Sequence, residues 1–151
     1  HKFNKLPGRF LLQGNDGKFL PVGNIAGLVN EHYGMTPLVS DFNADGYPDI
    51  VYVNYDGPVK AYLNDGGENH YLTVRMRDTA ASLGAKVIVW AGDREFVQDF
   101  VSGTGLISDQ SSDLFFGLGA YDGVVTLKVI WANGEKEQFD DVEIDRVFTP
   151  L

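Results

Sequence analysis

Short apolar runs alternate with polar turns along most of the chain. Runs rich in Val, Ile, Tyr, Phe and Thr are separated by clusters of Gly, Asn and Asp about every ten residues, a pattern typical of β-strands. We expect strands at 49–55, 59–63, 70–76, 86–91, 96–102, 113–118, 124–131 and 135–142. The 18 glycines interrupt most windows long enough for a helix. The pattern therefore predicts an all-β fold with at most one helical turn, at 24–29.

Two segments near the N-terminus echo each other. Residues 9–19 and 60–67 each read as an apolar strand closed by an Asn, Asp and Gly turn. Their separation of about 50 residues is typical of a propeller blade, and one such repeat cannot bury a core alone. We therefore expect upstream repeats in the same chain. The polar stretch 65–69 is the expected boundary, which gives a propeller-blade-like repeat over 1–68 and an antiparallel β-sandwich-like domain over 69–151.

Charge and composition narrow the classes of partner. Twelve Lys and Arg face 21 Asp and Glu, a formal charge of −9, which repels nucleic acid. No apolar run approaches the roughly 20 residues of a membrane helix, so we expect no membrane insertion. The chain lacks Cys, which excludes disulfides and thiolate metal sites. It begins at His1 without an initiator Met, and we expect a fragment or a mature form.

The segment 41–49 has the spacing of a calcium loop. Oxygen-bearing side chains stand at positions one, three and five, Asp41, Asn43 and Asp45, and a further carboxylate stands at position nine, Asp49. Calcium prefers 6–8 oxygen ligands, and a Gly at position six permits the sharp turn that brings them together. The backbone carbonyl of Tyr47 is the expected fifth ligand. Three carboxylates this close would repel one another without a cation.

A polar turn is the alternative interpretation of this segment. Asp and Asn side chains often bond to the backbone of their own loop, which needs no metal. The segment does not fit an EF-hand, because Tyr52 stands where an EF-hand places its bidentate Glu, and the residues after Asp49 read as a strand. A calcium ion here would therefore fix the entry of a strand, which is a structural role.

The loop and its surroundings resemble an FG-GAP (VCBS-type) repeat. The resemblance rests on Asp41-Phe-Asn-Ala-Asp-Gly-Tyr-Pro-Asp49, the following Val53-Asn-Tyr-Asp-Gly57 and the strand ending in Asn64-Asp-Gly66. In that family each repeat is one blade of a calcium-binding propeller, as in the integrin α-chain head. The resemblance implies the same calcium ligands, Asp41, Asn43, Asp45, Tyr47 and Asp49.

The remainder resembles an ASPIC/UnbV domain, which often follows such repeats. The motifs are Asn69-His-Tyr-Leu72, Leu83-Gly-Ala-Lys-Val87, Val101-Ser-Gly-Thr-Gly105, Phe115-Phe-Gly-Leu-Gly119 and Val129-Ile-Trp131. Two positions depart from the family pattern: residues 79–83 replace its Arg-Asp-Gly-Ile, and Ala132 stands where Pro is common. The resemblance implies a secreted, periplasmic or cell-surface protein without established catalytic activity.

The sequence offers no recognisable catalytic centre. It lacks Gly-x-Ser-x-Gly and His-Glu-x-x-His patterns, and the adjacent Asp140 and Asp141 would point to opposite faces of a strand. We expect a non-enzymatic, calcium-binding extracellular β module that serves adhesion or the binding of a protein or glycan ligand. A carbohydrate-binding module accessory to an enzyme is the alternative, if Trp90 and Trp131 are exposed, and hydrolase activity is a third option. The polar loop 103–112 is a further candidate for recognition.

Overall fold

The computed structural model describes residues 9–77, 80–103, 109 and 111–150. All regular elements in these residues are strands, so the predicted all-β class is confirmed. They are β1 (Leu11–Gln13), β2 (Phe19–Pro21), β3 (Gly34–Ser40), β4 (Asp49–Asn54), β5 (Lys60–Tyr62), β6 (His70–Arg75), β7 (Lys86–Ala91), β8 (Arg94–Asp99), β9 (Asp113–Gly119), β10 (Val125–Ile130), β11 (Lys136–Val142) and β12 (Arg146–Phe148).

The helical turn expected at 24–29 is only a hydrogen-bonded turn. The amide of Ala26 donates to the carbonyl of Val22, and Leu28 bonds back to Gly23 without continuing into a helix. Within the described ranges, no helix has the length and apolarity needed to cross a bilayer.

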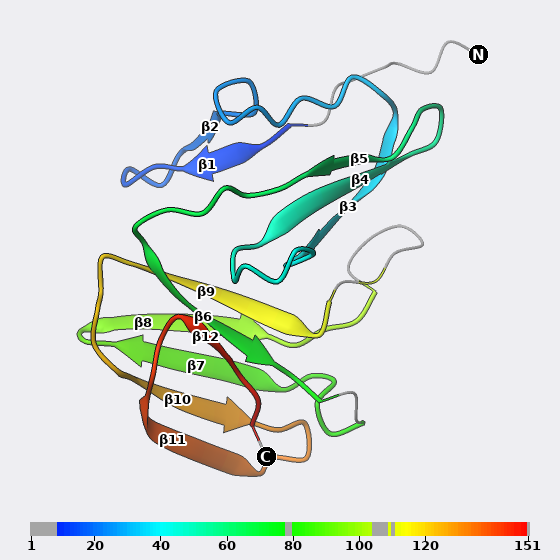
Figure 1. The fold of residues 1–151 in the computed structure, drawn as a ribbon. Coiled ribbons are helices and arrows are strands. Elements are labelled where there is room, and N and C mark those ends of the chain that lie inside the picture. The colour runs from blue at the N-terminus through cyan, green and yellow to red at the C-terminus, as the bar shows by residue number, and fades with distance from the viewer. Residues whose placement is uncertain (1–8, 78–79, 104–108, 110, 151) are drawn as a thin grey trace.

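The strands before residue 68 form two small sheets (Figure 1). Strands β1 and β2 make an isolated antiparallel hairpin, and β3, β4 and β5 make an antiparallel meander with β4 in the middle. Pro37 lies within β3, which pairs only with β4 and is therefore an edge strand, where a missing N–H is tolerated.

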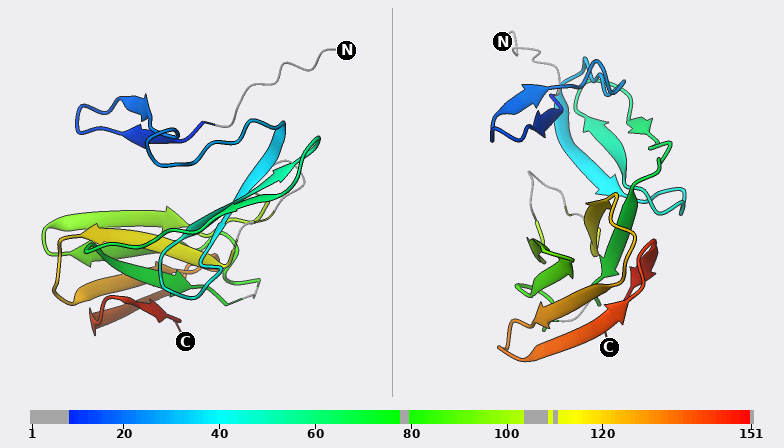
Figure 2. Two further views of the ribbon diagram at one scale, coloured as in Figure 1. Left: turned by 45° about the horizontal axis from the view of Figure 1, so that its top comes forward. Right: turned by 90° about the vertical axis from the view of Figure 1, so that its left-hand side faces the viewer.

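The strands after residue 69 form a sandwich of two sheets (Figure 2). One sheet has the order β11-β10-β7-β8 and the other β12-β6-β9. The pairings are antiparallel except that of β12 with β6, which is parallel. Buried side chains such as Leu72, Phe116, Val87 and Leu127 come from the facing sides of both sheets and form one apolar cluster.

Burial is unequal between the two parts of the chain. The described members of the buried apolar cluster all lie between Leu72 and Val142. Before residue 68, Tyr52 is the sole buried hydrophobic residue among those described, whereas Leu12, Phe19 and Leu20 are each more than half exposed. The sandwich therefore has a core of its own, and the N-terminal sheets have almost none.

Candidate metal centre

The segment 41–49 is the loop that joins β3 to β4. Ser40 and Asp49 are paired across the two strands, so the loop closes a hairpin. Two of its residues have positive φ, Ala44 at 61° and Gly46 at 93°. The second value suits the Gly at position six, because side chains disfavour this backbone region. The tight winding predicted from the spacing is therefore present.

Three of the predicted ligands bond to the loop's own backbone. Asp41 Oδ1 and Oδ2 accept hydrogen bonds from the amides of Asp45 and Gly46, at 3.1 and 2.9 Å. Asn43 Oδ1 accepts from the Asp45 amide at 3.2 Å. Asp45 accepts from the Tyr47 amide at 2.9 Å and from the Asn43 side-chain amide at 2.7 Å. These are the bonds that the polar-turn interpretation predicts.

Asp49 differs from the other ligands because it is buried, with 1% of its surface exposed. Its Oδ2 accepts from the amide of Phe42 at 2.9 Å, and its Oδ1 accepts from the amide of Asn64 at 2.8 Å. A buried carboxylate is costly unless it is hydrogen-bonded, and these two donors meet that requirement. Asp49 therefore ties the start of the loop to the segment after β5.

The donor chemistry of the loop fits calcium. Side-chain oxygens from Asp41, Asn43, Asp45 and Asp49 are hard ligands, and a carboxylate oxygen that accepts one hydrogen bond keeps a second lone pair. Over the residues that the structure describes, none of the three carboxylates forms an ion pair with Lys or Arg. The same residues contain no group of three His, Asp or Glu side chains already converged on one point. The loop thus supplies suitable ligands, and in this structure their side chains are hydrogen-bonded to backbone amides.

Three residues outside the predicted ligand set contact the loop: Asn64, Gly67 and Tyr71. The Tyr47 hydroxyl donates to the carbonyl of Gly67 at 2.8 Å, and its ring lies 5.4 Å from that of Tyr71 on β6. Asn64 donates through Nδ2 to the carbonyl of Pro48. Burial raises the pKa of the Tyr71 phenol, and nearby acidic groups including Asp145, Asp41 and Asp45 raise it further. No spacing in the sequence connects Tyr71 with the loop.

The remaining candidates for binding or catalysis are the two tryptophans, the Asp140–Asp141 pair and the 103–112 loop. Trp90 is half-buried and donates its indole N–H to Glu95 at 2.8 Å, and Trp131 is partly buried and packs against the sandwich core. Asp140 accepts hydrogen bonds from Gln138 and Thr126. Most of the 103–112 loop lies outside the described residues.

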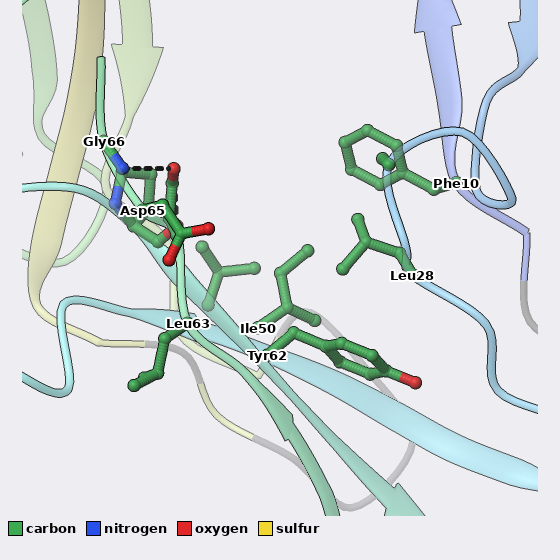
Figure 3. Close-up of a pocket in the computed structure, with 11 residues that line it drawn as sticks. Phe10, Leu28, Ile50, Tyr62, Leu63, Asp65 and Gly66 are labelled. Atoms are coloured by element: carbon green, nitrogen blue, oxygen red, sulfur yellow. Dashed lines mark hydrogen bonds between the residues drawn. The ribbon is translucent and has the colours of Figure 1, made fainter.

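An apolar cavity of about 580 Å³ lies beside the loop 41–49, between the N-terminal segment and the β3-β4-β5 sheet. Figure 3 shows Phe10 and Leu28 on one side, with Ile50 and Tyr62 on the other. Asn64, Asp65 and Gly66 also line it. The lining offers apolar contact and little chemistry.

The match to a protein family lies in the second part of the chain. Residues 75–149, from the end of β6 through β12, match the family model for ASPIC and UnbV. The ASPIC/UnbV resemblance predicted from the motifs is thus supported, and the FG-GAP resemblance stays a prediction. The chain is similar to cartilage acidic protein 1 of Mus musculus, 40% identical over 70 residues, which are 46% of this chain and 10% of the relative. It is 39% identical to the Homo sapiens protein of that name over 67 residues, 44% of this chain and 10% of the relative. The matched region spans about a tenth of the length of these relatives.

Proposed function

We propose that the chain is a non-enzymatic, calcium-binding extracellular β module that serves adhesion or ligand binding within a larger protein. The observation that carries the calcium site is the strand-entry loop 41–49, a tight turn with positive φ at Gly46 whose side chains supply oxygen ligands at alternate positions. Side chains of Asp41, Asn43 and Asp45, the carbonyl of Tyr47 and the carboxylate of Asp49 would hold the ion. The ion would offset the repulsion between the three carboxylates and stabilise the β3–β4 hairpin.

Further repeats of the same chain are the partners we propose for the N-terminal sheets. Leu11, Leu12, Phe19 and Leu20 of the β1–β2 hairpin are about half exposed or more, although monomeric proteins rarely leave large apolar patches uncovered. Neighbouring repeats would cover them, as repeat proteins build a continuous core by stacking. The ligand of the assembled protein is a protein or a glycan in this proposal.

The proposed location is secreted, periplasmic or on the cell surface. The relatives' name, cartilage acidic protein 1, refers to a cartilage protein, and this chain is itself acidic, with a formal charge of −9. Millimolar calcium is available outside the cell, and extracellular calcium modules bind at about 10⁻⁴–10⁻³ M. A structural calcium loop of that affinity suits such a location.

Thermal unfolding in calcium tests this function. We expect millimolar calcium to raise the Tm of the chain, because a ligand that binds only the folded state stabilises it by RT ln(1 + [L]/Kd), about 1.4 kcal/mol at ten times Kd. Asp45→Ala should remove the rise in Tm because it removes a predicted calcium ligand. Asp45 is exposed, so this substitution should leave the calcium-free fold nearly intact. Asp93→Ala, in the β7–β8 turn, is the matched control and should keep the rise. An unchanged Tm in wild type at several millimolar calcium would refute the calcium site.

A further inference from the structure

The outer face of strand β6 lies under the N-terminal part of the chain. Side chains alternate along a strand, so Leu72 and Val74 point into the core while Tyr71, Thr73 and Arg75 point away from it. Thr73 is nevertheless only 2% exposed. A small hollow shared by Val39 of β3 with Phe115 of β9 shows that β3 lies alongside this sheet. The two parts of the chain therefore meet on this outer face.

Tyr71 lies directly against the metal loop at Gly46. A Cβ placed on Gly46 would fall 1.8 Å from the Tyr71 hydroxyl oxygen, so only a residue without a side chain permits this approach. The Tyr71 ring also lies 5.4 Å from the Tyr47 ring, at 53°. Figure 2 shows the β3–β4 loop reaching toward β6. The wall of the loop is thus formed partly by the second part of the chain.

The segment that connects the two parts is held by the same loop. Asp49 accepts from the amide of Asn64, and the Tyr47 hydroxyl donates to the carbonyl of Gly67. Gly66 packs so closely on the Tyr47 ring that an added Cβ would lie 2.7 Å from it. Two of the predicted calcium ligands, Tyr47 and Asp49, therefore also fix the connecting segment.

Tyr71 is anchored on its other side by the sandwich. Its amide donates to Asp145 Oδ1 at 3.1 Å, and its carbonyl accepts from the Asp145 amide at 2.7 Å. Asp145 Oδ2 lies 2.7 Å from His70 Nδ1. Partial burial acts to raise the pKa of Asp145, but hydrogen bonds from His70 and the Tyr71 amide give a net lowering. The Tyr71 backbone is therefore fixed to Asp145, which precedes β12, and its side chain extends from this fixed point toward the loop.

We propose that the loop 41–49 is a cation-dependent clamp between the two parts of the chain, with Tyr71 as the positioning residue that transmits the state of the loop to β6. The inference rests on the proposed calcium site. Calcium bound by Asp41, Asn43, Asp45, Tyr47 and Asp49 orders the loop, and the ordered loop holds the connecting segment and the Tyr71 ring. The metal therefore sets how rigidly the N-terminal sheets sit on the sandwich.

Hydrogen–deuterium exchange of the 151-residue chain, with and without calcium, tests the clamp. Amide hydrogens that exchange only when the loop has released its calcium should exchange about eleven-fold more slowly at a calcium concentration ten times Kd. We expect this slowing in the loop and also across residues 64–75. Slowing confined to 41–54 in wild type would overturn the clamp, and this comparison decides the proposal without any variant.

Variants at Tyr71 test its role as the transmitting residue. In Tyr71→Ala the loop should still slow with calcium, whereas residues 64–75 should lose the effect. Tyr71→Phe keeps the ring and should retain most of it. Tyr55→Ala removes a tyrosine that is 74% exposed and paired with Tyr33, and serves as the matched control. An unchanged response at 64–75 in Tyr71→Ala would contradict the assigned role.

Calorimetric titration of wild type with calcium separates the two proposals. If calcium does not bind, the proposed calcium function fails and the clamp fails with it. If calcium binds with one-to-one stoichiometry and the exchange of 64–75 is unchanged, the calcium function stands and only the clamp is wrong. Binding together with slowed exchange at 64–75 supports both.

Discussion

Gly46 shows how a single residue position serves both the loop and the contact between the two parts. Its φ of 93° closes the turn that orients Asp41 and Asp45, and its missing side chain leaves room for Tyr71. The first requirement is common to turns of this kind. The second arises only because the sandwich packs against the loop. A substitution at Gly46 therefore acts on local strain and on long-range packing together.

Gly46→Ala should lower the free energy of unfolding by more than Gly134→Ala does. Both glycines have similar φ, 93° and 88°, but a Cβ at Gly134 meets nothing within 4 Å. Backbone strain alone should cost each variant about 1–2 kcal/mol. The clash with Tyr71 should add about 1–3 kcal/mol to Gly46→Ala, as overpacking does. Urea unfolding without calcium measures the difference, and equal losses would contradict the close Gly46–Tyr71 contact.

The candidate site could be predicted from the sequence only as far as its local spacing reaches. The alternation of Asp41, Asn43 and Asp45 and the glycine at position six predicted the tight turn, which the structure contains. The assignment of the five residues as calcium ligands remains a prediction. Asn64 and Tyr71 join the site through strand pairing and packing across the two parts of the chain, and the sequence carries no pattern for such contacts.

At the scale of elements, the sequence predicted best the strands with one buried face. Strand β7 was expected at 86–91 and has these bounds, because Val87, Val89 and Ala91 alternate into the core. Strand β1 falls in the apolar run predicted within 9–19, whereas β2 was missed because it has three residues and no buried side chain. Strand β3 was missed because Pro37 argues against a strand, although an edge strand accepts it. Strand β12 pairs with the distant β6, which no local pattern reveals.

The β10–β11 connection illustrates the limit of turn rules. The dipeptide Asn133-Gly134 is typical of a two-residue turn with two positive φ values, but of these two residues only Gly134 has a positive φ. The Gly134 amide bonds to the carbonyl of Trp131, and the Trp131 amide bonds to that of Glu135. This is the longer hairpin connection in which a turn is followed by one left-handed glycine. The dipeptide therefore marks the hairpin correctly but does not indicate its turn type.

A core substitution should separate the contributions of the two parts. Leu72→Ala in β6 removes a side chain with 0% exposure and should cost about 2–5 kcal/mol. Leu12→Ala in β1 removes one that is 58% exposed and should change the free energy of unfolding by less than about 0.5 kcal/mol. The midpoint of urea unfolding is the measurement. A large loss for Leu12→Ala would mean that the hairpin packs against the rest of this chain more closely than its exposure indicates.

At the scale of the whole molecule, one part folds around its own core and the other depends on contacts. The sandwich buries a continuous apolar cluster between two sheets, and it contains the region that matches ASPIC and UnbV. The N-terminal sheets bury little, yet they carry the candidate metal loop and rest on the sandwich at Tyr71. A bound ion at this junction would add stability where the apolar core contributes least.

A crystal structure determined with calcium in the buffer tests the central claim most directly. The account predicts one ion within about 2.3–2.6 Å of oxygens from Asp41, Asn43, Asp45, Asp49 and the Tyr47 carbonyl, the usual range for calcium ligands. The Asn43 side-chain amide would turn away from Asp45 in that state, freeing the Asp45 carboxylate that it now contacts at 2.7 Å. A loop that keeps its present hydrogen bonds and shows no ion at several millimolar calcium would contradict the account.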